Sequence, residues 1–283
     1  YESIDASRGG LDYSLYNFKK GYLYLYYFKD YQASFEMYNS IKQQIYTNSI
    51  ADYIKTDIFK RISIYYCKAG FILILNNKYE EALDNFTCSL KIDPNNGLPY
   101  IGMAISYLKL GVKDKALELG IEAKRIALQD LNVLINLGYI YTYLNMFDEA
   151  IQEYKYCISI FPRDARSYYN LSYVYIMKGE WDLALKYLQK AITLKPRFKE
   201  AYNNIGYIYW HKGNFYDAIL FFKKAIELKQ DFLPSRFNLA MALVVMGRYT
   251  EAREELYNIL KYDPNNETVK LNIKEIERII SQQ

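Results

Sequence analysis

The sequence predicts an all-α fold in which short helices stack into a solenoid. Alanine recurs every 34 residues over six cycles, at Ala82, Ala116, Ala150, Ala184, Ala218 and Ala252. A period of this length is typical of helical repeats, in which each repeat buries its apolar face only against its neighbours. We therefore expect function to reside on an extended surface rather than in one deep pocket.

Small and turn-forming residues share this period, counted from Ser63 as position 1. Position 8 is always small: Gly70, Ala104, Gly138, Ser172, Gly206 and Ala240. Together with alanine at position 20, it predicts closely packed helices. Position 15 holds Asn77, Gly111, Asn145, Gly179, Gly213 and Gly247, residue types that accept positive φ where a helix ends. Position 32 is proline in four repeats, at Pro94, Pro162, Pro196 and Pro264. Each repeat is thus predicted to be a helix, a turn and a second helix.

The repeat that begins at residue 165 carries the fullest pattern: Tyr168, Leu171, Ser172, Tyr175, Gly179, Trp181, Ala184, Leu188, Ala191 and Pro196. This pattern resembles the tetratricopeptide (TPR) repeat. The resemblance covers residues 63–266 as six TPR repeats, with starts at 63, 97, 131, 165, 199 and 233, and it implies a right-handed α-solenoid. The second repeat departs most, because Gly120 and Leu128 stand where an aromatic residue and a proline are usual. We expect a local bend or a looser helix there.

Segments outside the six repeats are predicted from helical spacing. Residues 1–14 are expected to form a tail, and residues 15–62 a divergent helical repeat plus a helical insert. One long helix is predicted from about Asp52 to about Leu75. Residues 267–283 are expected to be a capping helix, since Val269, Ile273, Ile276 and Ile280 form an apolar stripe on it.

Composition limits the classes of partner. The net charge is only +4 and the charges are interspersed, so no nucleic acid is expected as a partner. The longest apolar runs are too short to cross a bilayer, so no membrane span is expected in this chain. The first residue is Tyr rather than Met, which predicts a trimmed or processed protein. The sequence does not distinguish a cytoplasmic from a periplasmic location. It also does not exclude a homo-oligomer.

Catalytic chemistry has little support in the sequence. His211 is the only histidine, so a catalytic triad or a histidine metal cluster would depend on it alone. Cys67, Cys88 and Cys157 have irregular spacing and match no metal pattern, which favours structural thiols. No phosphate-binding glycine loop is present. We expect no catalytic residues, no metal and no cofactor, and hence no enzyme.

The TPR resemblance places positions 2, 5, 6, 9, 12 and 13 of each first helix on the concave face of the solenoid. Position 6 is asparagine in four consecutive repeats: Asn136, Asn170, Asn204 and Asn238. Position 9 is tyrosine in three of them: Tyr139, Tyr173 and Tyr207. An amide can pair with both the C=O and the N–H of an extended peptide, and this row resembles the asparagine ladder in the TPR region of the O-GlcNAc transferases. The alternative is that these asparagines bond within their own repeats or reflect an Asn-rich composition.

Two further features belong to the predicted groove. Arg163, Arg166 and Arg197 lie at repeat boundaries and would give the groove either a basic edge that favours acidic segments or merely a solvated edge. In the N-terminal half the corresponding positions are mostly apolar: Cys67, Phe71, Ile74, Ile101, Ile105 and Leu108. Such a stripe needs a cover, which either residues 1–62 or a partner's amphipathic helix would provide.

The function predicted from these features is a non-enzymatic scaffold or adaptor that binds a protein or peptide in the concave groove. One alternative is a structural component of a larger assembly, in the cell envelope or motility machinery, that uses the convex face or the ends. Another is the substrate-recognition arm of a longer enzyme. The sequence does not identify the partner, because fold alone does not determine function.

Overall fold

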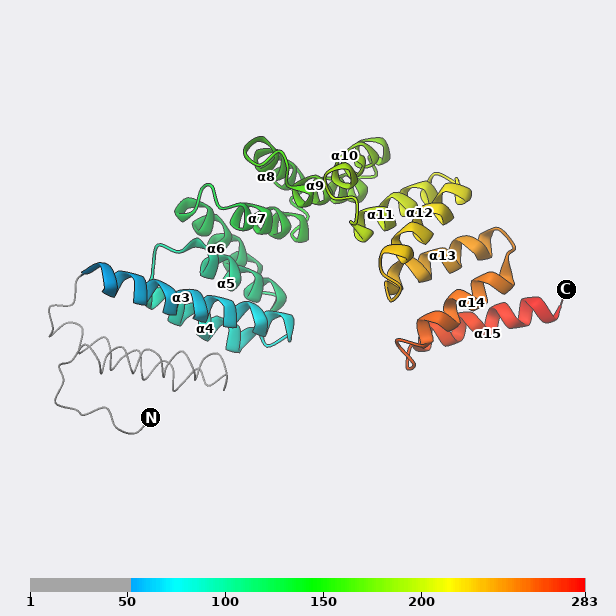
Figure 1. Cartoon of the computed structure of the whole chain (residues 1–283), viewed down its shortest axis with the longest axis horizontal. Coiled ribbons are helices and arrows are strands. Elements are labelled where there is room, and N and C mark those ends of the chain that lie inside the picture. Colours follow the sequence, from blue (N-terminus) through cyan, green and yellow to red (C-terminus); the bar gives the residue numbers. More distant parts are fainter. Residues whose placement is uncertain (1–51, 283) are drawn as a thin grey trace. The chain divides into compact units, whose positions relative to one another are not determined.

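The computed structural model describes residues 52–282. Within this range the chain forms thirteen helices and no strand (Figure 1). The predicted all-α fold class is confirmed for these residues. The expected tail, and most of the segment expected to hold a divergent repeat, lie outside them.

The helices alternate as first and second members of repeats. Their bounds are α3 Asp52–Leu75, α4 Tyr79–Ile92, α5 Gly97–Lys109, α6 Lys113–Ile126, α7 Leu131–Tyr143, α8 Phe147–Ile160, α9 Ala165–Met177, α10 Trp181–Leu194, α11 Lys199–His211, α12 Phe215–Leu228, α13 Leu233–Val245, α14 Tyr249–Leu260 and α15 Glu267–Ser281. The first helices α5, α7, α9, α11 and α13 have 13 residues each. Hence the 34-residue period reflects a repeated helix length.

A positive-φ residue ends the first helix of every repeat. It is Asn77, Gly111, Asn145, Gly179, Gly213 or Gly247, with φ between 58° and 83°. After α9, the Gly179 N–H donates to the Ile176 carbonyl at 3.0 Å and the Glu180 N–H donates to the Tyr175 carbonyl at 2.8 Å. This pair of bonds is the Schellman motif, which satisfies carbonyls that the helix end would leave unpaired.

The described residues fall into two compact units, divided within α7 after Ile140. In the N-terminal unit, α3 packs on α4, α4 on α5, and α5 on α6. Phe86 is fully buried between two glycines of neighbouring first helices. A Cβ on Gly70 would lie 2.6 Å from its ring, and one on Gly102 would lie 2.2 Å from it. The aromatic ring therefore fits only because both positions lack a side chain.

Repeat 2 has an unbroken second helix despite its unusual sequence. α6 runs through Gly120 as a helix of 14 residues, the same length as α4 and α8, so Gly120 does not interrupt it. Leu137 and Ile140 of α7 explain the glycine, because their Cδ1 atoms would each lie 3.1 Å from a Cβ on Gly120. They occupy space that a larger residue would need.

The C-terminal unit extends from Tyr141 and contains α8 to α15. Its first helices form a layer, since α9 contacts α11 and α11 contacts α13. The second helices α10, α12 and α14 each pack on the first helix of their own repeat. The alanines at position 20 are fully buried where these helices meet.

The last helix, α15, begins at an asparagine cap: the Asn266 side chain accepts from the Val269 N–H at 3.1 Å. Val269, Ile273 and Ile276 are buried, and α15 packs on α14. Lys270 and Lys274 are exposed. The helix thus presents an apolar side to the last repeat and a polar side to water.

Candidate functional site

The asparagine and tyrosine rows of the C-terminal unit share one face of the α9, α11 and α13 layer. Residues three apart on a helix are neighbours on its surface, so each position-6 asparagine lies beside the position-9 residue of its repeat. Tyr173 and Tyr207 remain 44% and 37% exposed. We call this surface the first-helix face and define it by six residues: Asn170, Tyr173, Asn204, Tyr207, Asn238 and Met241.

A hydrogen-bond network joins α11 to α13 at this face. The Asn238 Nδ2 donates to Asn203 Oδ1 at 3.0 Å, and the Ser235 hydroxyl donates to the same oxygen at 2.8 Å. The Asn203 Nδ2 in turn approaches Asn204 Oδ1 at 3.5 Å. Asn203 was not among the predicted site residues, although it stands at position 5, next to the asparagine row, on the predicted concave face. The network orients the Asn238 amide, whose nitrogen is already engaged.

The other two amides of this face differ in accessibility. The Asn204 Nδ2 is buried and has no hydrogen-bond partner within the described residues. A peptide could therefore use that nitrogen only after the amide rotates. Burial raises the pKa of neighbouring Tyr169, and the nearby Asn204 side chain acts in the opposite direction. Asn170 is partly buried, and no residue of the described range bonds to its side chain, so it is the most available amide of the row.

The remaining members of the rows, Asn136 and Tyr139, lie on α7 within the N-terminal unit. The Asn136 Nδ2 donates to the Asn132 carbonyl at 2.7 Å, as expected if this asparagine serves its own helix. The Lys109 ammonium donates to the Tyr139 hydroxyl at 3.0 Å. Both side chains are thus engaged by their own unit, which favours the structural interpretation at these two positions.

His211 is surrounded by aromatic rings. Its imidazole stacks on Trp181 of the preceding repeat, with centroids 5.0 Å apart and planes 12° apart. Tyr207 and Trp210 meet it edge-on at 4.4 Å and 4.9 Å. These contacts explain the histidine as an exposed packing residue at the end of α11. The contact of Trp181 across the repeat boundary was not predicted from the sequence.

The predicted basic edge is weaker than its three arginines indicate. Arg166 Nε pairs with Asp164 Oδ1 at 2.9 Å. The same aspartate caps α9 by accepting from the Ser167 N–H at 3.0 Å. Arg163 and Arg197 are exposed. An acidic partner would therefore meet two arginines here, together with one guanidinium that already has a carboxylate.

The apolar positions of the N-terminal unit are largely interior. Ile101 and Leu108 are fully buried, whereas Phe71, Ile74 and Ile105 are partly buried. Phe71 packs edge-on against Phe86 at 5.1 Å. Ile101 and Leu108 are therefore closed to solvent in this structure. The predicted cover falls mainly in residues 1–51, outside the described range.

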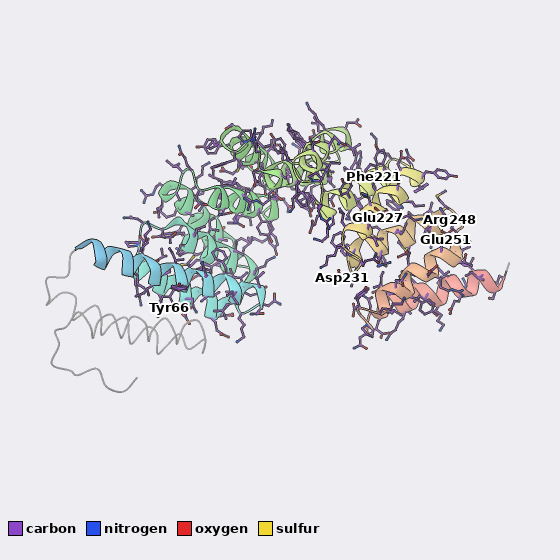
Figure 2. The ribbon with its side chains drawn as sticks, in the orientation of Figure 1. Tyr66, Phe221, Glu227, Asp231, Arg248 and Glu251 are labelled. Atoms are coloured by element: carbon purple, nitrogen blue, oxygen red, sulfur yellow. The ribbon has the colours of Figure 1, made fainter. Side chains whose placement is uncertain are left out.

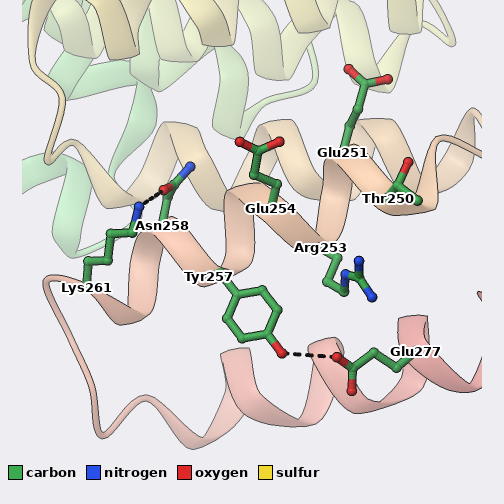
Figure 3. Close-up of a pocket in the computed structure, with 8 residues that line it drawn as sticks. All are labelled: Thr250, Glu251, Arg253, Glu254, Tyr257, Asn258, Lys261 and Glu277. Carbon is green, nitrogen blue, oxygen red and sulfur yellow. Dashed lines mark hydrogen bonds between the residues drawn. The ribbon is translucent and has the colours of Figure 1, made fainter.

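A polar cavity of about 650 Å³ lies on α14 and α15 (Figure 3). Its lining residues are Thr250, Glu251, Arg253, Glu254, Tyr257, Asn258, Lys261 and Glu277. The Tyr257 hydroxyl donates to Glu277 Oε1 at 3.0 Å, and this bond raises the pKa of Tyr257. The mixture of acids and bases gives this cavity no dominant charge.

A second cavity, of about 450 Å³, lies where α13, α14 and α15 meet. It is lined by Leu233, Pro234, Phe237, Asn238, Ile259, Asn266, Thr268 and Val269. Most of these side chains are apolar. Asn238 belongs both to this cavity and to the first-helix face.

Residues 52–282 contain neither a cluster of metal-binding side chains nor a membrane-spanning helix. No group of three metal-binding side chains occurs among them. None of the helices in this range has the length and apolar character that a bilayer-spanning segment requires.

Family models match a continuous stretch of the chain. Models described as tetratricopeptide repeat match residues 131–164, 153–186, 200–232 and 233–266, and one described as TPR repeat matches residues 173–213. Two of these matches begin at 131 and 233, which are repeat starts predicted from the 34-residue period.

A curated relative is the Photosystem I assembly protein Ycf3 of Prochlorococcus marinus (strain MIT 9211). It is 38% identical over 85 residues, which make up 29% of this chain and 49% of the relative. The chain therefore spans about half the length of the curated relative it matches.

Solved TPR structures share the fold. TTC0263, a thermophilic TPR protein from Thermus thermophilus, has a TM-score of 0.58 at 25% identity, covering 64% of this chain and 99% of its own. A tetratricopeptide repeat protein from Parabacteroides merdae ATCC 43184 has a TM-score of 0.67 at 16% identity, covering 94% and 99%. PilF of Pseudomonas aeruginosa has a TM-score of 0.62 at 16% identity, covering 78% and 98%. With these matches and the helix-turn-helix repeats described above, residues 131–266 of the chain consist of tetratricopeptide repeats.

Proposed function

We propose that the chain is a non-enzymatic protein-interaction scaffold that binds an extended partner segment on its first-helix face. The observation that carries this proposal is the exposure of Tyr173 and Tyr207 on adjacent first helices, beside a row of asparagines. Tyr154, Tyr168 and Tyr175 of the same unit are buried, so the fold has room for tyrosine in its interior. A rigid ring with a polar tip is well suited to an interface.

The asparagine row supports binding through the partner's main chain. Asn170 offers both a donor and an acceptor, and Asn238 offers its oxygen because its nitrogen is held by Asn203. Asn204 would take part by rotating its amide away from the interior. Such contacts resemble the ladder of the O-GlcNAc transferases and hold an extended segment without requiring a particular sequence. Asn136 contributes less, because its nitrogen bonds to its own helix.

The comparison with the curated relative supports an adaptor role. That relative is called an assembly protein, and the chain matches about half of it. Repeat proteins suit such work, because a continuous surface contacts a partner over many residues. We propose the general role of bringing proteins together and do not carry over the relative's own partner.

Affinity capture from native lysate tests this proposal. The double variant Asn170→Ala, Asn204→Ala is compared with the unaltered chain and with Asn258→Ala, which removes an amide from α14. We expect the double variant to lose a partner that the other two retain. Its thermal midpoint should change by only a few degrees, because these residues are not core. Retention of every partner would overturn the role of the first-helix face.

A second candidate function is supported by one observation on the outer side of repeat 5. Tyr216 and Leu220 lie one turn apart on α12 and are 76% and 62% exposed. At the equivalent positions 18 and 22, the other repeats carry only polar residues: Glu80, Asp84, Asp114, Glu118, Asp148, Gln152, Asp182, Lys186, Thr250 and Glu254. This pair favours a structural component that uses its outer face.

The variant Tyr216→Thr, Leu220→Gln tests the second candidate. Arg248, at the N-cap of α14, pairs with Glu251 at 2.6 Å (Figure 2), and the variant changes neither of these residues. If the outer face binds, this variant loses partners that Asn170→Ala, Asn204→Ala keeps. If Asn170→Ala, Asn204→Ala instead loses partners that Tyr216→Thr, Leu220→Gln keeps, the second candidate is rejected.

A further inference from the structure

The cavity between α13, α14 and α15 has apolar walls that water can reach. Leu233 and Phe237 of α13 are only partly buried, whereas Ile259 of α14 and Val269 of α15 are buried behind them. Exposed Thr268 lies at the rim. A volume of about 450 Å³ falls within the range of cavities that bind small molecules or side chains.

The start of α15 gives the cavity a fixed wall. The Asn266 side chain accepts from the Val269 N–H at 3.1 Å and donates to Asp263 at 2.9 Å. These bonds hold the first turn of α15, while Ile273 and Ile276 anchor the rest of the helix in the core. The cavity is therefore preformed, so little ordering would be needed to fill it.

The cavity lining carries no charged side chain, and the charged side chains next to it are paired with opposite charges. None of the eight lining residues is charged. Arg236, which precedes Phe237, is buried and pairs with Glu255 at 2.6 Å. Lys270 pairs with Glu267 at 2.8 Å on the surface of α15. An uncharged apolar group is therefore the complementary occupant, since a charged group would lose hydration without gaining a partner.

Asn238 connects this cavity to the first-helix face. Its nitrogen is bonded to Asn203, so the amide presents its oxygen as an acceptor. An N–H of a bound main chain can donate to that oxygen while the adjacent side chain enters the cavity. We infer that the cavity anchors the partner segment by one large uncharged apolar side chain, such as Leu, Met, Phe or Trp. This inference rests on the proposed function and specifies the chemistry of the segment.

The test uses small probes and the full chain with labelled methyl groups. N-acetyl-leucine amide and N-acetyl-phenylalanine amide are titrated while the methyl resonances of Leu233, Ile259 and Val269 are followed by NMR. N-acetyl-glutamate amide and N-acetyl-lysine amide serve as charged controls. We expect saturable shifts with the two apolar probes and at least tenfold weaker binding of the charged ones. Equal shifts with all four probes, or none with the apolar ones, would overturn the inference.

Two variants at the rim locate the binding. Thr268→Trp fills the opening, and Thr268→Glu adds a charge at a helix N-terminus, where a carboxylate is tolerated. Both should weaken the apolar probes at least tenfold, whereas Lys270→Trp, on the same helix but outside the lining, should not. Shifts that persist in both rim variants would show that the probes bind elsewhere and would reject the cavity as the anchor.

The test separates this inference from the proposed function, because the probes need no partner protein. If the apolar probes bind at the cavity while Asn170→Ala, Asn204→Ala keeps every partner, the cavity is supported as a binding site and main-chain binding by these asparagines is rejected. If the double variant loses its partner but no apolar probe binds, the scaffold stands and the anchor is rejected.

Discussion

At the residue scale, the side chains that pack and the side chains that we propose to bind a partner differ in exposure. Glycine at positions 70 and 102 makes room for the buried ring of Phe86. Asn203 holds Asn238 and Ser235 in a network that fixes one amide and leaves its oxygen to accept. Tyr173 and Tyr207 keep a large part of their rings in water. The same residue types thus serve structure at one position and, in our proposal, recognition at another.

Gly102→Ala should destabilise the N-terminal unit. Its new Cβ would lie 2.2 Å from the Phe86 ring, a distance that forces the ring or the helix to move. Overpacking of this kind costs about 1–3 kcal/mol, which exceeds the gain of up to about 1 kcal/mol in helix propensity. Denaturant unfolding measures the change. Adding Phe86→Leu should recover part of the loss. A Gly102→Ala protein as stable as the unaltered chain would contradict this packing.

Cys67 should be unreactive in the folded protein. Burial raises the pKa of its thiol from 9.0 to about 12, so at pH 8 the folded state holds almost no thiolate there. Alkylation with iodoacetamide followed by mass spectrometry should label half-buried Cys88 before Cys67. The reverse order would contradict the burial of Cys67.

The same shift predicts the sign of a pH effect on stability. The raised pKa means that the folded state retains a proton which the unfolded chain releases near pH 9. The contribution of Cys67 is therefore fully present below about pH 9 and is lost as the pH rises toward 12. Cys67→Ala should show a smaller fall in stability over this interval than the unaltered chain. If the stability of both proteins depended on pH in the same way, the Cys67 thiol would be exposed to water in the folded state.

At the element scale, the helices follow local rules that the sequence displays directly. Gly179 at positive φ ends α9, and Pro162 lies in the turn that separates α8 from α9. The role of Gly120 in α6 could not be predicted from the sequence, because it depends on contacts with Leu137 and Ile140 of the next helix. The asparagine and tyrosine rows could be read from the 34-residue period. The bond between Asn238 and Asn203 could not, because it depends on how α13 meets α11.

The turn after α9 offers a test of these local rules. Gly179 has φ +74°, and Asn77 and Asn145 hold the equivalent position at φ 58° and 61°. Gly179→Asn should therefore cost only a few tenths of a kcal/mol, whereas Gly179→Val should cost about 1–2 kcal/mol because a branched Cβ is strained there. Thermal unfolding of the two variants distinguishes them. Equal losses would argue against the strain explanation.

At the scale of the whole molecule, the chain is a repeat protein whose described residues form two compact units. Stability in such arrays comes from each repeat and its contacts with immediate neighbours. The last repeat relies on α15, whose Val269, Ile273 and Ile276 are buried. A function that uses one surface of the C-terminal unit is compatible with this organisation, because neighbouring first helices are held in register by direct contact.

Ile273→Asp should show how far stability is transmitted. An unpaired carboxylate in the contact between α15 and α14 is costly, so α15 should detach. Hydrogen exchange should then show the greatest loss of protection in α13 and α14, and a smaller loss in α9 and α10. Lys274→Asp, at an exposed position of the same helix, is the matched control. Equal loss throughout the C-terminal unit would contradict coupling between nearest neighbours.

The central claim, that partners bind the first-helix face, is tested most directly by photo-crosslinking. The photoreactive residue p-benzoylphenylalanine replaces Tyr173 or Tyr207 on this face, and Tyr216 or Tyr257 on α12 or α14 in matched proteins. All four tyrosines are exposed, so each substitution leaves the core intact. After irradiation in native lysate, we predict a common partner adduct from positions 173 and 207 that is absent from positions 216 and 257. Adducts formed only from 216 or 257 would contradict the account and assign binding to the outer face.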